Sequence, residues 1–312
     1  MKQKILVADK MHESLADLLD QVGYSCDYRP MITREEIISC ISDYIGLIIR
    51  SKTQVDHELL ADAANLKFVG RAGAGVDQID VDLLQELGIV LYNAPEGNRD
   101  ALGEHAIGML LSVMHKIHSA DQEIRLKQWR REPNRGMELK GKTVGIFGFG
   151  YMGSSVAEKL AGFGCRVIGF DKYKSGFGNK SIREVSIETF CEETEILSLH
   201  VPLTDETRQL IDESWLARFA RLKILLNTAR GEVLVLEDIL KMLQSGRLYG
   251  AAFDVLENEQ FDRYTIKQVE VFETLAKLPN VLFTPHVGGW TFESYQKINE
   301  VLVEKISNGK HI

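Results

Sequence analysis

The sequence has 312 residues, of which 45% are hydrophobic and 26% are charged, and this balance excludes a disordered or fibrous protein. The formal net charge is −8, so the chain lacks the basic character of a nucleic-acid-binding protein. The length exceeds what one hydrophobic core usually supports, and we expect two domains.

The cysteines lie far apart, without a C-x-x-C spacing or a nearby histidine pair: Cys26, Cys40, Cys165 and Cys191. This spacing argues against a zinc site or a disulfide framework and fits a reducing compartment. Charges interrupt the first nine positions, and the longest apolar stretch, around residues 106–114, is shorter than the roughly 20 residues that cross a bilayer. We therefore expect a cytoplasmic protein with no metal, no nucleic-acid partner and no membrane partner.

Short β-forming runs alternate with helical patterns along the first part of the chain. Strands are expected at residues 5–8, 47–49, 68–70 and 89–92, with helical spacing of leucine and alanine between them. This alternation is typical of a mostly parallel sheet covered by helices. Proline and glycine then predict a loop at residues 93–98.

A second series follows a long helical pattern at residues 101–128 and a loop at 132–136. Its expected strands are at residues 143–147, 167–170, 196–199, 224–227, 251–254 and 281–284. The two series predict two α/β domains with doubly wound parallel sheets and a boundary near residue 98.

The stretch from Gly148 to Gly153 reads Gly-Phe-Gly-Tyr-Met-Gly, between an expected strand and an expected helix. In this context Gly148 permits a tight turn, Gly150 lets the backbone approach a pyrophosphate, and Gly153 lets the helix pack on the strand. A plain strand–turn–helix corner is the alternative. Asp171 ends the next strand, about 20 residues beyond the loop, where it can hydrogen-bond the ribose hydroxyls of NAD. A 2′-phosphate would meet that charge, so NAD is favoured over NADP, although two neighbouring lysines weaken the preference.

Polar residues follow later strands of the second series: Arg230, the acidic stretch at residues 254–259, and His286. Each alone has an ordinary interpretation, as a surface arginine, a solvated acidic turn or a capping histidine. Parallel strands end at one sheet edge, however, so all should lie beside the dinucleotide loop. Hydride transfer to a keto acid needs such a set: a cation that binds the carboxylate, a side chain that carries the proton, and a group that sets the pKa of that side chain.

Several motifs together resemble the D-isomer-specific 2-hydroxyacid dehydrogenases, and among them the phosphoglycerate dehydrogenases. The resemblance covers nearly the whole chain, through RSKT (50–53), GRAGAGVD (70–77), GKTVGI (141–146), HVPLT (200–204), NTARG (227–231), GAAFDV (250–255) and TPHVGG (284–289).

The resemblance implies that Arg230 binds the substrate's carboxylate and keto oxygen, that His286 is the general acid and base, and that Glu259 hydrogen-bonds His286 and favours its protonated form. It also implies cofactor contacts from Gly148, Gly150, Tyr151, Met152, Gly153, Asp171, His200, Pro202, Thr207, Thr228, Ala229, Asp254 and Gly289. Besides Arg230, the implied substrate-binding residues are Arg50 and the backbone amides of Ala74, Gly75 and Val76.

The family architecture is a Rossmann NAD-binding domain, here residues 99–286, inserted into a flavodoxin-like substrate-binding domain formed by residues 1–98 and 287–312. A homodimer is implied, formed through the long helix from Ala101. The expected reaction is oxidation of 3-phospho-D-glycerate with NAD in serine biosynthesis, without a serine-sensing domain, since only 26 residues follow His286. The alternatives are a glyoxylate or hydroxypyruvate reductase and, in a different class, an NAD-sensing corepressor.

The chain departs from the family pattern at several positions. Gln260 replaces a proline, Leu256 an aromatic residue and Gln78 an asparagine, and residues 261–278 form a longer segment than usual. Trp290 stands where small residues are frequent. We expect Trp290 either to line the active site or to pack at a domain interface.

Overall fold

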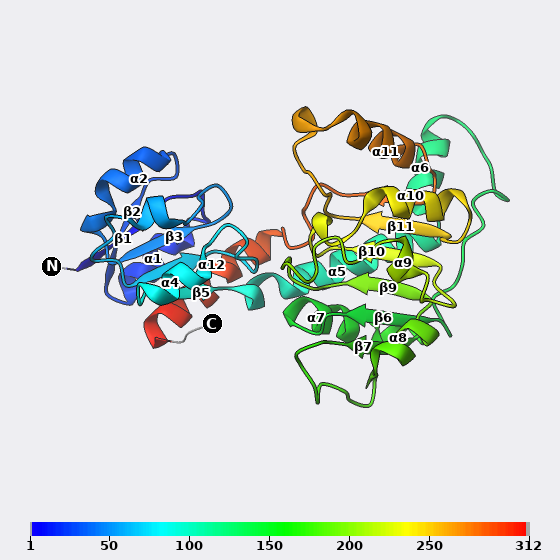
Figure 1. Ribbon diagram of the computed structural model, residues 1–312, viewed down its shortest axis with the longest axis horizontal. Helices are drawn as coiled ribbons and strands as arrows, with labels where there is room; N and C mark the ends of the chain where they lie inside the picture. Colours follow the sequence, from blue (N-terminus) through cyan, green and yellow to red (C-terminus); the bar gives the residue numbers. More distant parts are fainter. Residues whose placement is uncertain (1, 310–312) are drawn as a thin grey trace. The chain divides into compact units, whose positions relative to one another are not determined.

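The computed structural model describes residues 2–309, so Met1 and the last three residues of the expected 287–312 segment lie outside the described part. The chain divides into two compact units (Figure 1). Unit 1 comprises Met1–Asp100 and Trp290–Ile312, and unit 2 comprises Ala101–Gly289. These limits lie within three residues of the expected boundaries at 98 and 287.

Unit 1 contains a five-stranded parallel sheet with the order β2-β1-β3-β4-β5. The strands are β1 (Gln3–Val7), β2 (Tyr24–Tyr28), β3 (Gly46–Ile49), β4 (Phe68–Arg71) and β5 (Val90–Asn93). This is the flavodoxin-like order, in which the direction of winding reverses between β1 and β3.

Helices cover both faces of this sheet. Successive residues of β1 point to opposite sides, so Ile5 and Val7 pack in one apolar cluster with Leu302, whereas Leu6 packs in another with Ile37. The first cluster joins the sheet to α1 and α12, which brings the C-terminal segment back to unit 1 (Figure 1). The helices of this unit are α1 (Ser14–Gln21), α2 (Arg34–Cys40), α3 (His57–Leu60), α4 (Val81–Glu86) and α12 (Phe292–Asn308), with the short 3₁₀ helix η1 (Ile41–Asp43).

Unit 2 contains a seven-stranded parallel sheet with the order β12-β11-β10-β9-β6-β7-β8. Counted from β6, this is the Rossmann order with β12 added at one edge. The strands are β6 (Thr143–Phe147), β7 (Arg166–Phe170), β8 (Ile182–Glu184), β9 (Ile196–Leu199), β10 (Ile224–Asn227), β11 (Gly250–Phe253) and β12 (Val281–Phe283). The two parallel sheets confirm the predicted fold class.

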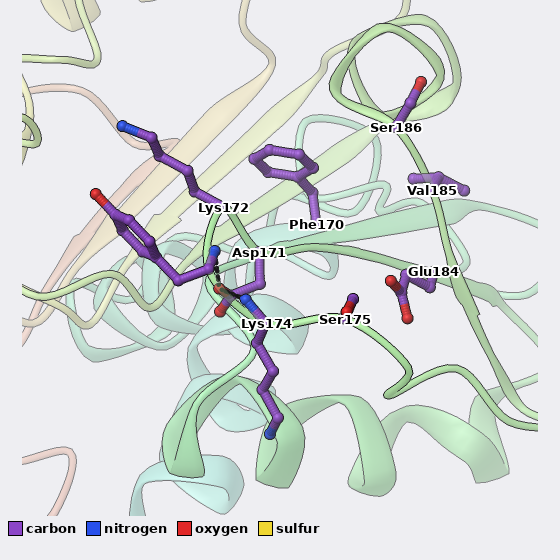
Figure 2. A pocket seen from close by; sticks show the side chains of 9 residues that line it. Phe170, Asp171, Lys172, Lys174, Ser175, Glu184, Val185 and Ser186 are labelled. Carbon is purple, nitrogen blue, oxygen red and sulfur yellow. Dashed lines mark hydrogen bonds between the residues drawn. The ribbon is translucent and has the colours of Figure 1, made fainter.

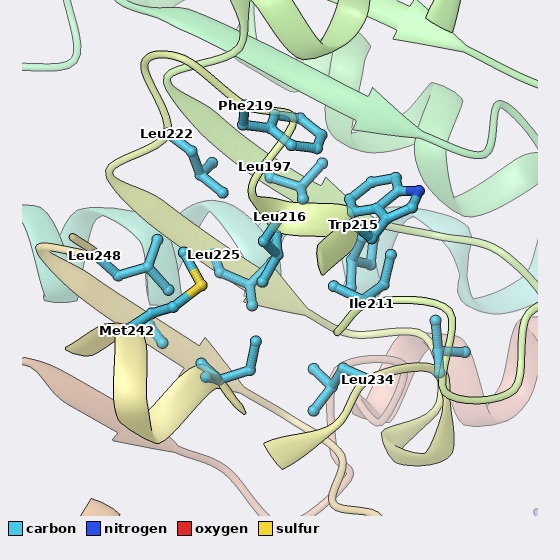
Figure 3. Close-up of a cluster of buried hydrophobic side chains, with 14 of the residues drawn as sticks. Leu197, Ile211, Trp215, Leu216, Phe219, Leu222, Leu225, Leu234, Met242 and Leu248 are labelled. Carbon is cyan, nitrogen blue, oxygen red and sulfur yellow. The ribbon is translucent and has the colours of Figure 1, made fainter. Parts of the chain in front are cut away.

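Two apolar clusters hold helices against the faces of this sheet. On one face, Trp215 and Phe219 pack against Leu197 of β9 and Leu225 of β10 (Figure 3). On the other, Leu110 packs in a cluster with Val144 of β6. The helices are α5 (Pro95–Met114), α6 (Ile117–Arg125), α7 (Tyr151–Lys159), α8 (Ile187–Glu193), α9 (Glu213–Leu216), α10 (Leu236–Gln244) and α11 (Ile266–Ala276), with η2 (Leu160–Phe163), η3 (Gly231–Val233) and η4 (Phe261–Arg263). Residues 95–100 of α5 belong to unit 1, and the rest of that helix belongs to unit 2.

Two expectations about the middle of the chain are wrong. The expected loop at residues 93–98 already contains the start of α5 at Pro95, because proline has no amide hydrogen to lose and is favoured in the first helical turn. The expected single helix at 101–128 is two helices, since Lys116 has a left-handed backbone, with φ of 54°, between α5 and α6.

Candidate active site

The glycine loop connects β6 to α7, and its three glycines differ in the space around them. Gly148 has a φ of +92°, which favours glycine, and a Cβ there would lie 2.8 Å from the carbonyl of His200. A Cβ at Gly150 would meet no atom within 4 Å, so the backbone is open to a ligand. A Cβ at Gly153 would lie 2.1 Å from the Gly148 oxygen. Helix α7, which starts with Tyr151 and Met152, can therefore begin directly against the loop.

The loop lies where the strand order of unit 2 reverses, between β6 and β9. Ligands of open α/β sheets bind beyond the carboxyl ends of the strands at such a reversal. His200 follows β9, with Nε2 2.8 Å from Ser198 Oγ and Nδ1 3.5 Å from Thr228 Oγ1. Desolvation lowers the pKa of His200 to about 3, so its imidazole is neutral at neutral pH. Nearby, Thr207 Oγ1 donates to the carbonyl of Pro202 at 2.6 Å and closes a turn.

Asp171 lies at the end of β7, in a cavity of about 560 Å³ lined by residues 170–175 and 184–186 (Figure 2). One carboxylate oxygen accepts from the amide of Phe149 at 2.7 Å. The other accepts from the amides of Tyr173 and Lys174 at 2.9 Å each. A carboxylate has about four acceptor positions, so Asp171 can shape this loop and still accept from ribose hydroxyls.

The lysines beside Asp171 are already engaged. Figure 2 shows Lys172 and Lys174 extending in opposite directions from Asp171. Lys172 Nζ lies 2.6 Å from Glu206, and Lys174 Nζ donates to the carbonyl of Phe149 at 3.1 Å. The charge of Lys172 is thus balanced by a carboxylate, whereas Lys174 keeps its charge and two further donors.

Glu259 and His286 form a hydrogen-bonded pair, although 27 residues separate them. His286 Nδ1 lies 2.9 Å from Oε1 and 3.0 Å from Oε2 of Glu259. Both side chains are about half exposed, at 48% and 47%. Within residues 2–309 the other ring nitrogen, Nε2, makes no hydrogen bond, so it is available to a substrate. A carboxylate on one imidazole nitrogen and an open second nitrogen is the arrangement of a general acid and base.

Asp254 holds the loop that carries His286. Its buried carboxylate accepts from Thr284 Oγ1 at 2.6 Å and from the amides of Val287 and Gly288 at 3.0 and 2.8 Å. Desolvation acts to raise the pKa of Asp254, but hydrogen bonds from His105, Thr284 and the two amides outweigh it and hold the pKa at about 2. The expected cofactor residue Asp254 therefore supports the loop that carries His286, and unit 2 ends at Gly289.

His105 is a contributor that the sequence did not indicate. Its Nε2 lies 3.4 Å from Asp254 Oδ1 and 3.0 Å from Thr284 Oγ1. It belongs to α5, far from these residues in sequence and outside any motif, so no signal in one sequence could identify it.

Arg230 follows β10 in a turn that packs tightly on the segment after β11. Asn227 closes the turn, donating from Nδ2 to the Arg230 carbonyl at 2.9 Å and accepting from the Ala229 amide at 3.0 Å. A Cβ at Gly231 would lie 1.9 Å from the carbonyl carbon of Leu256, so only glycine fits there. Arg230 is half-buried, and its Nη1 donates to the Ala229 carbonyl at 2.7 Å.

The long segment after Glu259 forms η4 and α11. Its aromatic side chains cluster next to the Glu259–His286 pair. The rings of Phe261 and Phe272 lie 5.1 Å apart, and those of Phe272 and Phe283 lie 5.4 Å apart. They line a cavity of about 320 Å³ that also reaches Glu259 and His286. The departures from the family pattern thus alter the surroundings of the pair and leave its contact intact.

In unit 1, the expected carboxylate-binding loop follows β4. The amides of Ala74, Gly75 and Val76 donate no hydrogen bond within residues 2–309, and Asn93 Nδ2 holds the loop by donating to the Ala74 carbonyl at 2.8 Å. Gln78 Nε2 donates to the carbonyl of Arg50 at 2.5 Å. Gln78, which stands where the family usually has asparagine, therefore links this loop to the loop that carries Arg50.

Arg50 follows β3, at the reversal of strand order in unit 1. Its amide donates to Asp9 Oδ2 at 2.6 Å, and its guanidinium carbon lies 3.6 Å from the centre of the Trp290 ring. Burial lowers the pKa of Arg50, but a guanidinium remains protonated in proteins. Trp290 thus packs on an expected substrate-binding residue.

Residues 2–309 contain neither a membrane-spanning helix nor a metal-binding cluster of the kinds described next. No helix in this range is long and apolar enough to cross a membrane. Nor does the described chain gather three or more His, Cys, Asp or Glu residues in a group that could hold a metal ion.

The sequence matches one protein family and is similar to several known proteins. The sequence profile of the family described as D-isomer specific 2-hydroxyacid dehydrogenase, NAD binding domain, matches residues 107–288. The chain is 33% identical over 307 residues to a D-3-phosphoglycerate dehydrogenase of Archaeoglobus fulgidus, with 98% of this chain and 57% of that protein covered. It is 34% identical over 275 residues to a hydroxypyruvate reductase of Thermotoga maritima, with 88% of each covered.

A crystal structure of a protein from Thermus thermophilus superposes with a TM-score of 0.82 at 28% identity, and 99% of this chain and 98% of that one are covered. The chain spans little more than half the length of the phosphoglycerate dehydrogenases that it matches at 33% identity, 57% and 56%.

Proposed function

This chain belongs to the D-isomer specific 2-hydroxyacid dehydrogenases, and we propose that it is an NAD-dependent oxidoreductase that interconverts a D-2-hydroxy acid and its 2-keto acid. The Glu259–His286 pair carries this proposal. It follows β11 and β12 at the same carboxyl edge of the unit 2 sheet as the glycine loop, so a proton carrier and a dinucleotide loop occur together.

The glycine loop and Asp171 fit NAD. The open backbone at Gly150, the start of α7 and the remaining acceptor capacity of Asp171 suit the pyrophosphate and the adenosine ribose. When NAD is bound, its nicotinamide takes or supplies the hydride. Further contacts are proposed from the other residues named for the cofactor: Tyr151, Met152, His200, Pro202, Thr207, Thr228, Ala229, Asp254 and Gly289.

The remaining steps fall to side chains of the protein. Arg230 would bind the substrate's carboxylate and polarise its keto oxygen through its forked N–H groups. His286 Nε2 would give a proton to that oxygen during reduction and take it back during oxidation, while Glu259 stabilises the protonated imidazole from Nδ1.

For the substrate we propose 3-phospho-D-glycerate and its keto acid, as used in serine biosynthesis. Two observations support it: archaeal relatives with that name at 33% identity, and Arg50, a cation whose backbone is joined through Gln78 to the loop that carries the free amides of residues 74–76. Hydroxypyruvate or glyoxylate is the alternative, favoured by the similarity to the Thermotoga maritima reductase.

We also propose a cytoplasmic homodimer formed through α5 and α6. Apolar side chains are exposed on α6 and just after it, at 56% for Ile117, 50% for Ile124 and 81% for Trp129, and such a patch favours association. The free thiols of Cys26, Cys40, Cys165 and Cys191 fit a reducing compartment.

Steady-state kinetics with 3-phosphoglycerate, phosphohydroxypyruvate, hydroxypyruvate and glyoxylate, measured side by side, test the proposal. We expect turnover with NAD or NADH and the highest kcat/KM for the phosphorylated pair. A higher kcat/KM for hydroxypyruvate or glyoxylate would favour the alternative. Binding of NAD without turnover of any acid would instead favour an NAD-sensing protein.

A further inference from the structure

The guanidinium of Arg50 lies over an aromatic platform formed by Trp290 and Tyr295, both in unit 1. Its guanidinium carbon is 3.6 Å from the centre of the Trp290 ring and 5.4 Å from that of Tyr295, and the two rings are 4.8 Å apart. An edge contact with the ring of His12, at 5.5 Å, supports Tyr295. Cation–π contact of this kind fixes a guanidinium without using its N–H groups.

Hydrogen bonds hold the backbone on both sides of this contact. Trp290 directly precedes the N-cap residue of α12, Thr291, whose amide and hydroxyl exchange hydrogen bonds with Ser294 at 2.9 and 3.0 Å. The backbone of Arg50 is held from both sides, by Asp9 at 2.6 Å and by Gln78 at 2.5 Å. The position of the guanidinium is therefore determined by its surroundings.

The guanidinium N–H groups of Arg50, unlike its backbone amide, donate no hydrogen bond among residues 2–309. The nearby carboxylate of Asp9 accepts from the amides of Arg50 and Lys52 and from Thr53 Oγ1, and not from the guanidinium. Lys52 does not compete for an anion, since its ammonium donates to the carbonyls of Ala8, Pro30 and Ile32 at 2.8–3.0 Å. All five donors of a guanidinium lie in its plane, so stacking leaves the edge free for a bidentate anion.

We propose that Trp290 determines substrate specificity as a positioning residue, holding the edge of Arg50 toward a second anionic group on the substrate. The substrate class is then 2-hydroxy and 2-keto acids with a phosphoryl or carboxylate group at the far end. This inference rests on the proposed dehydrogenase function and adds to it the residue that selects the dianionic substrate. Acids without such a group, such as glyoxylate, gain nothing from the platform.

Trp290→Leu tests this by removing the aromatic face while keeping an apolar side chain. We expect the KM for phosphohydroxypyruvate to rise about tenfold, with kcat and the KM for glyoxylate within about twofold of wild type. Trp290→Phe should restore most of the lost affinity. Arg50→Lys should also raise the KM for phosphohydroxypyruvate, because an ammonium cannot bind an anion through a planar fork. Phe292→Leu is the matched control, since Phe292 is 95% exposed and lies two residues away.

An equal loss for both substrates in Trp290→Leu, or no change for either, would overturn the inference. If wild type prefers oxaloacetate or 2-oxoglutarate, the proposed substrate is wrong and the same comparison is made with that acid. If wild type prefers no dianionic acid over glyoxylate, the inference fails while the dehydrogenase stands. If no acid is turned over, calorimetric titration with 3-phosphoglycerate decides: about tenfold weaker binding by Trp290→Leu supports the inference, whereas equal or absent binding refutes it.

Discussion

Asp254 fixes the backbone of His286 directly, because its main-chain carbonyl accepts a hydrogen bond from the His286 amide at 2.7 Å. His286 has a left-handed φ of 53°, a conformation that costs energy in any residue with a side chain. The Asp254 carboxylate offsets this cost by accepting from the amides of Val287 and Gly288. The imidazole is thus held in place by a residue that need not touch the substrate.

We expect Asp254→Asn to destabilise the protein by about 2 kcal/mol at pH 7, since the carboxamide nitrogen cannot accept from a buried amide. The pKa of Asp254 is held at about 2, below its ordinary 3.8, so this stability is present above about pH 4 and is lost as the pH falls toward 2. In urea unfolding, the difference in the free energy of unfolding between wild type and Asp254→Asn should become smaller as the pH falls over that range. Asp62→Asn, at an exposed position, is the control. Equal stability of Asp254→Asn and wild type at pH 7 would contradict this role.

Gly150 and Gly153 should respond differently to alanine. Gly150→Ala meets no protein atom, so we expect an unchanged Tm and at least about tenfold weaker NADH binding, because the methyl group blocks the pyrophosphate. Gly153→Ala forces a clash with the backbone of Gly148 and should lower the Tm by several degrees. Thermal unfolding and NADH titration of both variants, with Gly162→Ala as an open-space control, check this. Normal NADH affinity in Gly150→Ala would refute the assigned binding loop.

Asp171 should serve both the cofactor and the loop that contains it. We expect Asp171→Ala to weaken NADH binding more than NADPH binding, since the ribose acceptor and the negative charge are lost together. Asp171→Asn keeps one acceptor oxygen and should have an intermediate effect. The ratio of kcat/KM for the two cofactors measures this, and an unchanged ratio in Asp171→Ala would assign the preference to another residue.

His200 should remain neutral across the physiological pH range. Its pKa in the folded protein is about 3, against 6.5 ordinarily, so the unfolded chain binds one more proton between these values. Stability is therefore full above about pH 6.5 and falls by up to about 1.4 kcal/mol per pH unit below it. Unfolding of His200→Gln should take up one proton fewer than unfolding of wild type. The free energy of unfolding, measured between pH 4 and 6.5, should therefore depend less steeply on pH in the variant, by up to about 1.4 kcal/mol per pH unit. An identical slope would contradict the neutral assignment.

The sequence predicted the strands that lead into the site but not every element around it. The strands before Gly148, Asp171 and Arg230 are apolar runs with little ambiguity, and all of them occur. The edge strands β2 and β8 were missed because YSCDY and IRE are short and polar. The pairing of Glu259 with His286 came only from the family resemblance, since spacing alone cannot predict which side chains meet.

The contacts of Trp290 and His105 lie furthest beyond sequence reasoning. Trp290 reaches Arg50 from the other end of the chain, and His105 reaches Asp254 from α5. Neither contact leaves a periodic or motif signal, because both depend on how segments distant in sequence pack together. Such contacts become visible only once the fold is known.

Comparing wild type with His286→Asn in one NADH oxidation assay with phosphohydroxypyruvate, alongside NADH titration, tests whether His286 carries the proton. If His286 carries the proton, kcat should fall by at least about 100-fold while the NADH dissociation constant stays within about twofold. Asparagine keeps a polar side chain in the loop but cannot exchange a proton. Wild-type turnover by His286→Asn would contradict the account.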